Sequence, residues 1–273
     1  MIIGLDIGAC MTKGVLMDNS SIIKSFSTMT SNSIVSASKV LKALLRNKQR
    51  VKLAIAVSGG GSRNIGKKLL GLPVIKVDEI QAIGIGGLTL AGKSKGLIIN
   101  AGTGTSIVVA DNDGAKVVHV GGTGVGGGTI LGLSLRMLGI EEFEEVERLA
   151  ERGDANNVDL TVRDIVGGPI GIIPADVTAS NFGKLRSPAS REDVAAGIFN
   201  MVCQVIGVVG AMAAKAYGLS NSVVVTGGLV RSRLASEIIV DTMRLFGVEP
   251  IIPENGEYCT AIGAAQFLLK RMS

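Results

Sequence analysis

The sequence predicts an α/β protein built from two domains with a cleft between them. Short apolar runs alternate with stretches of helical periodicity along the 273 residues, which is the order typical of α/β folds. Both halves of the chain also open in the same way, with a strand, a turn rich in glycine and hydroxyl side chains, and a second strand. We place the boundary near residues 90–97 and expect domains at 1–95 and 96–273.

The first half is predicted to contain several strands and two helices. Ile2–Ile7 is a mostly apolar run that stops at Gly8, which predicts a strand entering a turn. Ser33–Leu45 carries apolar residues at helical spacing. The other expected elements are a compact loop at 8–13 and strands at 14–17, 53–57 and 74–77, the last ending at Asp78-Glu79, after which a Gly-broken helix is expected to run to about Leu90.

The second half restarts with an apolar strand at 96–100 and a second strand at 106–110. A strand at 117–120 then leads into a glycine-rich segment, 121–128. Helices are expected at about 129–138, 141–152, 157–166, 191–217, 231–246 and 260–272, with strands at 223–225 and 248–252.

Composition excludes several kinds of site. Aromatic residues make up 3% of the chain and Trp is absent, so we expect no stacking platform for nucleic acid. His119 is the sole histidine, which excludes a His-rich metal site. Cys10, Cys203 and Cys259 are odd in number and widely spaced, which favours a reducing cytoplasm. Polar residues interrupt the apolar stretch 198–218, so we expect a buried helix there and no membrane span.

Three turns have the composition of phosphate-binding sites. The first, 6–13, begins with Asp6, a carboxylate that can hold Mg²⁺ directly or through water, and ends with Lys13. The second, 100–106, combines small residues with hydroxyl groups. Taken alone, each of these two turns could also be an ordinary hairpin. The third, 121–129, has six glycines in eight residues before a predicted helix, whose N-terminus is a natural anion site.

Two common nucleotide-binding motifs fit the sequence poorly. No Gly-x-x-x-x-Gly-Lys-Ser/Thr segment occurs, so none of the turns is a Walker loop. Gly122-x-Gly124-x-x-Gly127 matches the Rossmann pattern only weakly. The strand before it is short, and no acidic residue follows in the expected strand-end context.

Further segments resemble a known superfamily. Thr226-Gly227-Gly228-Leu229 follows an apolar strand, and Gly263-Ala264-Ala265 lies in the last predicted helix. With the first two turns they are similar, in the same order, to the motifs of actin, heat-shock chaperone ATPases and sugar kinases. Within that superfamily the sequence resembles type II pantothenate kinases most specifically, and the resemblance extends over nearly the whole chain. The segments that carry it are 100–106, 120–129, 180–183, 254–256 and 261–264.

The resemblance implies a two-domain actin-like ATPase (ribonuclease H-like) fold with an interdomain nucleotide cleft. It implies ATP-dependent phosphorylation of pantothenate in the cytoplasm, the first step of coenzyme A biosynthesis. Glu79 takes the position of the catalytic glutamate, which accepts the hydroxyl proton; on sequence alone it could also be a carboxylate that favours a helix N-terminus. Asp6 is expected to serve Mg²⁺.

The same resemblance assigns binding residues. The acceptor side is expected to include Thr105, His119, Gly121 and Tyr258. Phe143 lies where the family has an aromatic residue near adenine, although it also fits the apolar face of a helix at 141–152. The residues expected to bind ATP are Gly8, Ala9, Cys10, Met11, Thr12, Lys13, Thr103, Gly126, Gly127, Gly128, Thr129, Ile130, Phe143 and Gly228.

Two positions depart from the family pattern. His119 stands where the family commonly has arginine, which is always charged and binds carboxylates with two hydrogen bonds. Histidine there could act as a simple hydrogen-bond donor, or it could suit pantetheine, an acceptor that lacks the carboxylate of pantothenate. Cys10 replaces a hydroxyl or glycine residue, and its thiol is a poor donor to phosphate.

Other interpretations of the scaffold stay open. One is an ATP-binding switch or activator of the same superfamily, although the three cysteines have no spacing that would hold an iron–sulfur cluster. Another is a kinase for a sugar or amino sugar. Beyond a small-molecule acceptor, the expected partner is a second copy of the chain, because the resembling family is dimeric and the apolar helix 191–217 is the expected interface. No nucleic-acid or membrane partner is expected.

Overall fold

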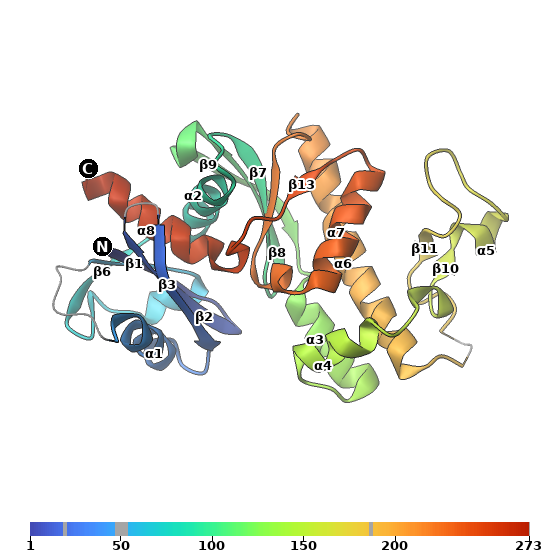
Figure 1. The fold of residues 1–273 in the computed structure, drawn as a ribbon, viewed down its shortest axis with the longest axis horizontal. Helices are drawn as coiled ribbons and strands as arrows, with labels where there is room; N and C mark the ends of the chain where they lie inside the picture. Colours follow the sequence, from blue (N-terminus) through green and yellow to red (C-terminus); the bar gives the residue numbers. More distant parts are fainter. Residues whose placement is uncertain (19–20, 47–53, 186–187, 273) are drawn as a thin grey trace.

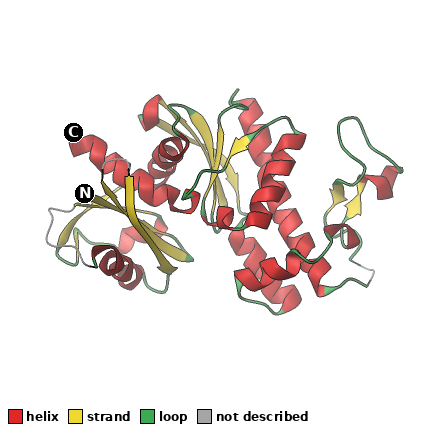
Figure 2. Cartoon of the chain, viewed as in Figure 1, coloured by secondary structure: helices red, strands yellow, loops and turns green. Residues whose placement is uncertain are grey.

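The computed structural model describes residues 1–18, 21–46, 54–185 and 188–272. They form two large β-sheets with two crossing helices between them and further helices on the outer faces (Figures 1 and 2). The predicted α/β class is therefore confirmed.

The first sheet has the strand order β3-β2-β1-β4-β6-β5. β1 (Ile2–Ile7) pairs antiparallel with β2 (Met11–Asp18) and parallel with β4 (Ala54–Ser58). Side chains alternate between its two faces, so Leu5 and Ile7 pack towards α1 (Ser33–Leu45), whereas Ile2 packs towards α8 (Cys259–Met272). The remaining strands are β3 (Ser21–Met29), β5 (Lys68–Leu69) and β6 (Leu72–Lys76).

The second sheet has the strand order β13-β12-β7-β8-β9. On one face, Ile98 and Val108 pack against α2 (Glu79–Ala91). On the other face, Leu97 and Ile107 belong to the core that the remaining large helices cover. The strands are β7 (Gly96–Ala101), β8 (Thr105–Asp111), β9 (Lys116–Thr123), β12 (Val223–Thr226) and β13 (Pro250–Ile251), and the helices are α3 (Gly127–Leu138), α4 (Phe143–Ala150), α6 (Arg191–Ala216) and α7 (Arg233–Leu245).

The two helices between the sheets, α2 and α8, cross with their backbones in contact (Figure 1). A Cβ atom on Gly263 of α8 would lie 1.8 Å from the carbonyl oxygen of Ala82, and one on Gly86 of α2 would lie 2.0 Å from that of Cys259. Only glycine fits at these two positions. The crossing brings the C-terminal helix back onto the first sheet.

A small arm extends from the C-terminal half of the molecule (Figure 1). It contains β10 (Leu160–Thr161), α5 (Val162–Val166) and β11 (Thr178–Ser180). The base of the arm is held by the fully buried Asp159. Its carboxylate accepts hydrogen bonds from the backbone of Phe182 and from the side chains of Thr178, Asn181 and Asn200. Asn200 lies on α6, so this cluster attaches the arm to the longest helix described.

Three local expectations were wrong. The helix expected at 157–166 is helical only over Val162–Val166, because residues 160–161 pair with β11 and Thr161 caps the short helix. β3 was missed because it is a half-exposed edge strand with little apolar periodicity. The turn segments were drawn too long, since residues 11–13 belong to β2 and 121–123 to β9.

α6 is the helix that the sequence marked as apolar. Its length and composition would allow it to cross a membrane, and it is the one such helix in the described part of the chain. Its most apolar window is 56% buried inside the structure, and Phe199 and Cys203 lie fully buried in the core of the second half. Both facts are expected of the core helix of a globular protein.

Candidate functional site

Three polar side chains form a row across the first sheet. Asp6 of β1 is the register partner of Lys13 in β2 and of Ser58 in β4. Register partners on adjacent strands project from the same face of a sheet, here the face that α8 covers. Farther along this face the side chains are apolar, for example Met17 and Ala56. The polar row therefore lies at the end of the apolar core on this face of the sheet.

Asp6 has no side-chain hydrogen bond or ion pair with any described residue. Burial raises the pKa of its carboxyl group to about 6; the Lys13 cation opposes this shift, and the Glu79 carboxylate adds to it. The Glu79 carboxylate is therefore close enough to Asp6 to disfavour its charged form. A partly buried carboxylate without a partner is a favourable place for a cation.

Lys13 connects this row to the second half of the chain. Its side chain is 8% exposed, and its Nζ atom donates a hydrogen bond of 2.9 Å to the carbonyl oxygen of Glu257. Burial lowers the pKa of the amine, against the opposing effect of Asp6. A Cβ atom on Gly228 would lie 3.3 Å from the same Nζ atom. The first turn and Gly228, which the sequence analysis assigned to ATP binding, thus lie together.

Glu79 is the first residue of α2 and is open to solvent. The cap of this helix is Asp78, whose Oδ1 atom accepts a hydrogen bond of 3.1 Å from the backbone of Gln81. Partial burial, and then the neighbouring Asp78, raise the pKa of Glu79. The helix therefore has its cap without Glu79, which leaves the Glu79 carboxylate available for chemistry.

The second and third turns pack into one backbone unit. Gly127 and Gly128 donate hydrogen bonds to the carbonyl oxygens of Gly102 (2.8 Å) and Thr103 (2.9 Å). The backbone of Gly126 donates to Thr129. These amides are satisfied within the protein, so in this conformation they do not form an open anion site. The glycines instead allow the Gly102–Thr103 turn to lie against the start of α3.

The first and second turns meet at Cys10. Thr103 donates a hydrogen bond of 3.3 Å from its hydroxyl to the Sγ atom of Cys10. Both residues are exposed, and they are 93 positions apart in the sequence. The turn 8–10 closes the hairpin of β1 and β2, with Gly8 donating to Met11. The first turn is therefore a hairpin, as its simpler interpretation held, and it also faces the other half of the molecule.

Other residues expected at the nucleotide have structural contacts. Thr12 is the register partner of Ile7, so its side chain lies on the α1 face, where it is bonded to Thr30. Ile130 is fully buried in the core. The ring of Phe143 packs on Phe199 with centroids 5.5 Å apart, which favours its interpretation as a core residue.

The residues expected on the acceptor side are more dispersed. Thr105 is buried and donates a hydrogen bond of 2.9 Å to the carbonyl oxygen of Val125. His119 is exposed on the edge strand β9, and Gly121 follows it after a β-bulge. Tyr258 is half-buried beside the apolar cluster of α8. Thr105 and Gly121 lie on neighbouring strands, whereas Tyr258 is near the Lys13 contact.

Sequence reasoning missed three components of this site. Ser58 completes the polar row, and Gly59 lies directly against Asp6: its φ angle is +84°, and a Cβ atom there would be 2.5 Å from Oδ1 of Asp6. The run of three glycines after a buried strand was the available signal. Glu257 contributes only a backbone carbonyl to Lys13, so no side-chain pattern could have indicated it.

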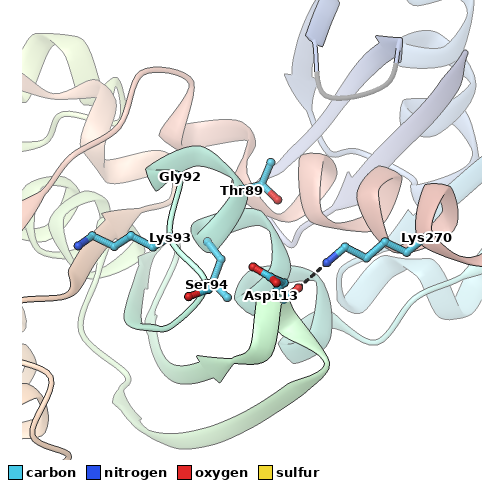
Figure 3. A pocket seen from close by; sticks show the side chains of 7 residues that line it. Thr89, Gly92, Lys93, Ser94, Asp113 and Lys270 are labelled. Atoms are coloured by element: carbon cyan, nitrogen blue, oxygen red, sulfur yellow. Dashed lines mark hydrogen bonds between the residues drawn. The ribbon is translucent and has the colours of Figure 1, made fainter.

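A separate hollow of about 410 Å³ lies at the other end of α2 (Figure 3). Its lining includes Thr89, Lys93 and Lys270, and Lys270 donates a hydrogen bond to the carbonyl oxygen of Asp113. No residue of the polar row or of the three turns lines it. The hollow is therefore distinct from the candidate site.

The acidic groups of the candidate site fit a magnesium ion that arrives with a nucleotide. Among the described residues, no cluster of three or more His, Cys, Asp or Glu side chains could hold a metal. Mg²⁺ keeps several waters and commonly takes one or two protein carboxylates together with substrate phosphates. The unpaired Asp6 carboxylate, with Glu79 near it, matches that requirement.

Comparisons with solved structures agree with the fold. An activator of 2-hydroxyisocaproyl-CoA dehydratase from Clostridium difficile with bound ADPNP superposes with a TM-score of 0.68, at 21% identity, covering 99% of this chain and 94% of that one. A ROK family glucokinase from Streptomyces griseus in complex with glucose and AMPPNP gives a TM-score of 0.59, at 14% identity, covering 97% and 98%. The two-sheet architecture is that of this group of nucleotide-binding proteins.

Comparisons with sequences are more specific. A sequence model of the Fumble family matches residues 96–266. A type II pantothenate kinase of Bacillus cereus is 30% identical over 280 residues, covering 99% of both chains. One from Staphylococcus aureus is 28% identical, covering 97% of this chain and 98% of its own. The chain therefore belongs to the type II pantothenate kinase family.

Proposed function

We propose that this chain transfers the γ-phosphate of ATP to the primary hydroxyl of pantothenate, the first step of coenzyme A biosynthesis. The observation that carries this proposal is that relatives of this family match 99% of the chain, and the unpartnered Asp6 carboxylate beside the first turn agrees with it. ATP and Mg²⁺ are the proposed cofactors, and the cytoplasm is the proposed location.

In the proposed reaction, Glu79 accepts the proton of the attacking hydroxyl. The acceptor oxygen forms a bond to the γ-phosphorus, and the bond from phosphorus to the β–γ bridging oxygen breaks, which leaves ADP. The raised pKa of Glu79 makes it a better proton acceptor than an ordinary surface glutamate. Phosphoryl transfer otherwise depends mainly on position and charge, which the turns and Lys13 are proposed to supply.

Magnesium, when bound, would neutralise charge on the phosphates. Asp6 is the proposed protein ligand, because its carboxylate is unpaired. Lys13 is proposed to act near the phosphates from its position between the first turn and Gly228. Thr103 and Cys10 are proposed to flank the same phosphates, because their contact joins the two turns.

Pantetheine is a second candidate acceptor. His119 replaces the arginine that the family commonly carries, and its exposed side chain makes no hydrogen bond or ion pair with a described residue. Histidine lacks the fixed charge and the two-pronged hydrogen bonding of arginine, so it gives less attraction for a carboxylate. A preference for pantetheine would follow from that difference.

An acceptor screen tests the function. ADP release by the purified protein is measured with pantothenate, pantetheine, glucose or no acceptor, always with Mg²⁺ and ATP. Release that requires pantothenate supports the proposal, and a higher kcat/KM with pantetheine selects the second acceptor. Nucleotide binding without acceptor-dependent turnover would instead indicate an ATP-binding switch.

A homodimer is part of the proposal. Met201, Val205, Val208 and Met212 follow the 4-3-4 spacing of a helix seam along α6, and Val208 and Met212 are 36% and 43% exposed. Light scattering of the wild type and of Met212→Glu tests it, since a charge in that seam should yield monomers. The proposed lobes are residues 1–95 and 96–273, with the nucleotide between them.

A further inference from the structure

The hydroxyl of Ser58 is buried and has no hydrogen-bond partner in the described part of the protein. A buried hydroxyl group without a partner lowers stability, so native structures contain few of them. The other case among the described residues is Ser134, in the middle of α3 and away from the polar row. Ser58 therefore carries an energetic cost that its packing does not explain.

Ser58 lies directly beside Asp6. The two are register partners on the adjacent strands β4 and β1, and both project towards α8. Val57 packs on the opposite face, towards α1, as the alternation of a strand requires. The chain then turns at Gly59 against the Oδ1 atom of Asp6. The backbone on both sides of the Ser58 hydroxyl is thus fitted to this carboxylate.

The Ser58 hydroxyl is a donor without an acceptor, and the Asp6 carboxylate beside it is an acceptor without a donor. Asp6 has no hydrogen bond or ion pair among the described residues, and neither has the Ser58 hydroxyl. A bond between them would satisfy the hydroxyl and fix the plane of the carboxylate. We propose that Ser58 is a positioning residue for the phosphoryl transfer, whose hydroxyl donates to Asp6 when magnesium and nucleotide occupy the site.

The proposal rests on the kinase function and gives Ser58 a specific task within it. Mg²⁺ requires nearly octahedral geometry, so a single carboxylate that can rotate is a poor ligand until something orients it. Ser58 would hold one Asp6 oxygen and leave the other for the ion or one of its waters. The unpaired hydroxyl lowers the stability of the empty protein and becomes useful only in the loaded state.

The test compares Ser58→Ala and Ser58→Thr with Ser134→Ala as a matched control. Thermal unfolding is measured without ligand and with Mg²⁺·AMPPNP, and kcat and KM are measured for ATP and pantothenate. Without ligand, both alanine variants should unfold about 2–4 °C higher than the wild type, because each removes an unpaired buried group. Ser58→Ala should lose about 10- to 100-fold in kcat, the scale of a hydrogen bond to a charged group, with KM for pantothenate unchanged.

Ser58→Ala should also show a smaller Mg²⁺·AMPPNP-induced rise in Tm, whereas Ser58→Thr should keep the wild-type rise and most of kcat. Ser134→Ala should retain both. A kcat of Ser58→Ala within twofold of the wild type overturns the proposal, as does an equal loss in Ser134→Ala or a lower Tm of unliganded Ser58→Ala. If the wild type itself lacks pantothenate kinase activity, the kinase function fails, and the ligand-induced Tm shifts still decide the role of Ser58.

Discussion

Thr103 donates a hydrogen bond to the thiol of Cys10 at 3.3 Å, and this contact joins the first turn of one half of the chain to the second turn of the other. A nucleotide whose phosphates lie between the two turns must fit around this pair. Chemical modification at Cys10 should therefore report directly on nucleotide binding.

Iodoacetamide should label one cysteine per chain, at Cys10. Cys10 is exposed, whereas Cys203 and Cys259 are buried and burial raises the pKa of both thiols. Labelling should abolish turnover, because the added group occupies the gap beside Thr103, and Mg²⁺·ATP should slow it. Intact-mass spectrometry with parallel activity assays checks this. Cys10→Ser should be resistant and active; full activity of the labelled wild type would contradict the prediction.

Glu79→Gln should lower kcat by about 100-fold or more and leave ATP binding unchanged, because the amide cannot accept the hydroxyl proton. Steady-state kinetics and calorimetric titration with AMPPNP provide the two measurements. Turnover close to that of the wild type would show that Glu79 is not the base.

Asp78→Asn tests the residue next to Glu79 by removing its charge. The helix cap should survive, since asparagine also caps helices. The Asp78 charge contributes to the raised pKa of Glu79. Without it, the pKa of Glu79 should fall, and the acidic limb of the pH–rate profile should move to lower pH. An unchanged limb would mean that another group governs it.

Asp6→Asn should stabilise the ligand-free protein at pH 7 and have little effect at pH 3.5. The pKa of Asp6 rises from 3.8 to about 6 on folding, so the folded state binds more protons between these values and stability falls as pH rises through that window. The cost at pH 7 is at most about 2–3 kcal/mol. Urea unfolding of the wild type and the variant at pH 7 and pH 3.5 measures this cost. An equal change in stability at both pH values would refute the raised pKa of Asp6. The variant should lose kinase activity.

Gly263→Ala should destabilise the protein by about 3 kcal/mol or more, because its Cβ atom would meet the carbonyl oxygen of Ala82 at 1.8 Å. Gly132→Ala is the control. Gly132 also lies inside a helix, but a Cβ atom there meets nothing within 4 Å, so alanine should add about 0.5–1 kcal/mol of stability. Denaturant unfolding compares them. Equal effects would mean that the α2–α8 crossing is not close-packed.

The sequence predicted most of the helices and strands whose own residues carry a clear apolar pattern. The apolar spacing of Ser33–Leu45 gave its helix with both ends correct, and the α/β class was also predicted correctly. β3 and the arm could not be predicted in this way, because strand pairing at an edge and the hydrogen bonds of Asp159 depend on residues far apart in the chain. The domain boundary near residue 95 stays a prediction.

The candidate site was predictable in part. Asp6 and Lys13 could be identified because charged residues near a strand end and a glycine turn are uncommon. The roles assigned to Gly127 and Gly128 assumed free amides, whereas the structure gives those amides carbonyl partners in the second turn. Ser58 could not be identified, since a lone serine has no distinctive pattern and its importance depends on cross-strand register.

The packing of α8 on the first sheet has a consequence for biosynthesis. This sheet is encoded at the beginning of the chain, but one of its two faces is covered by residues 259–272. During translation the nascent chain would expose Ile2, Val15 and Met17 until residues 259–272 had also been synthesised. The core on this face of the first sheet must therefore wait for α8, and this interval is when the polypeptide would most need a chaperone.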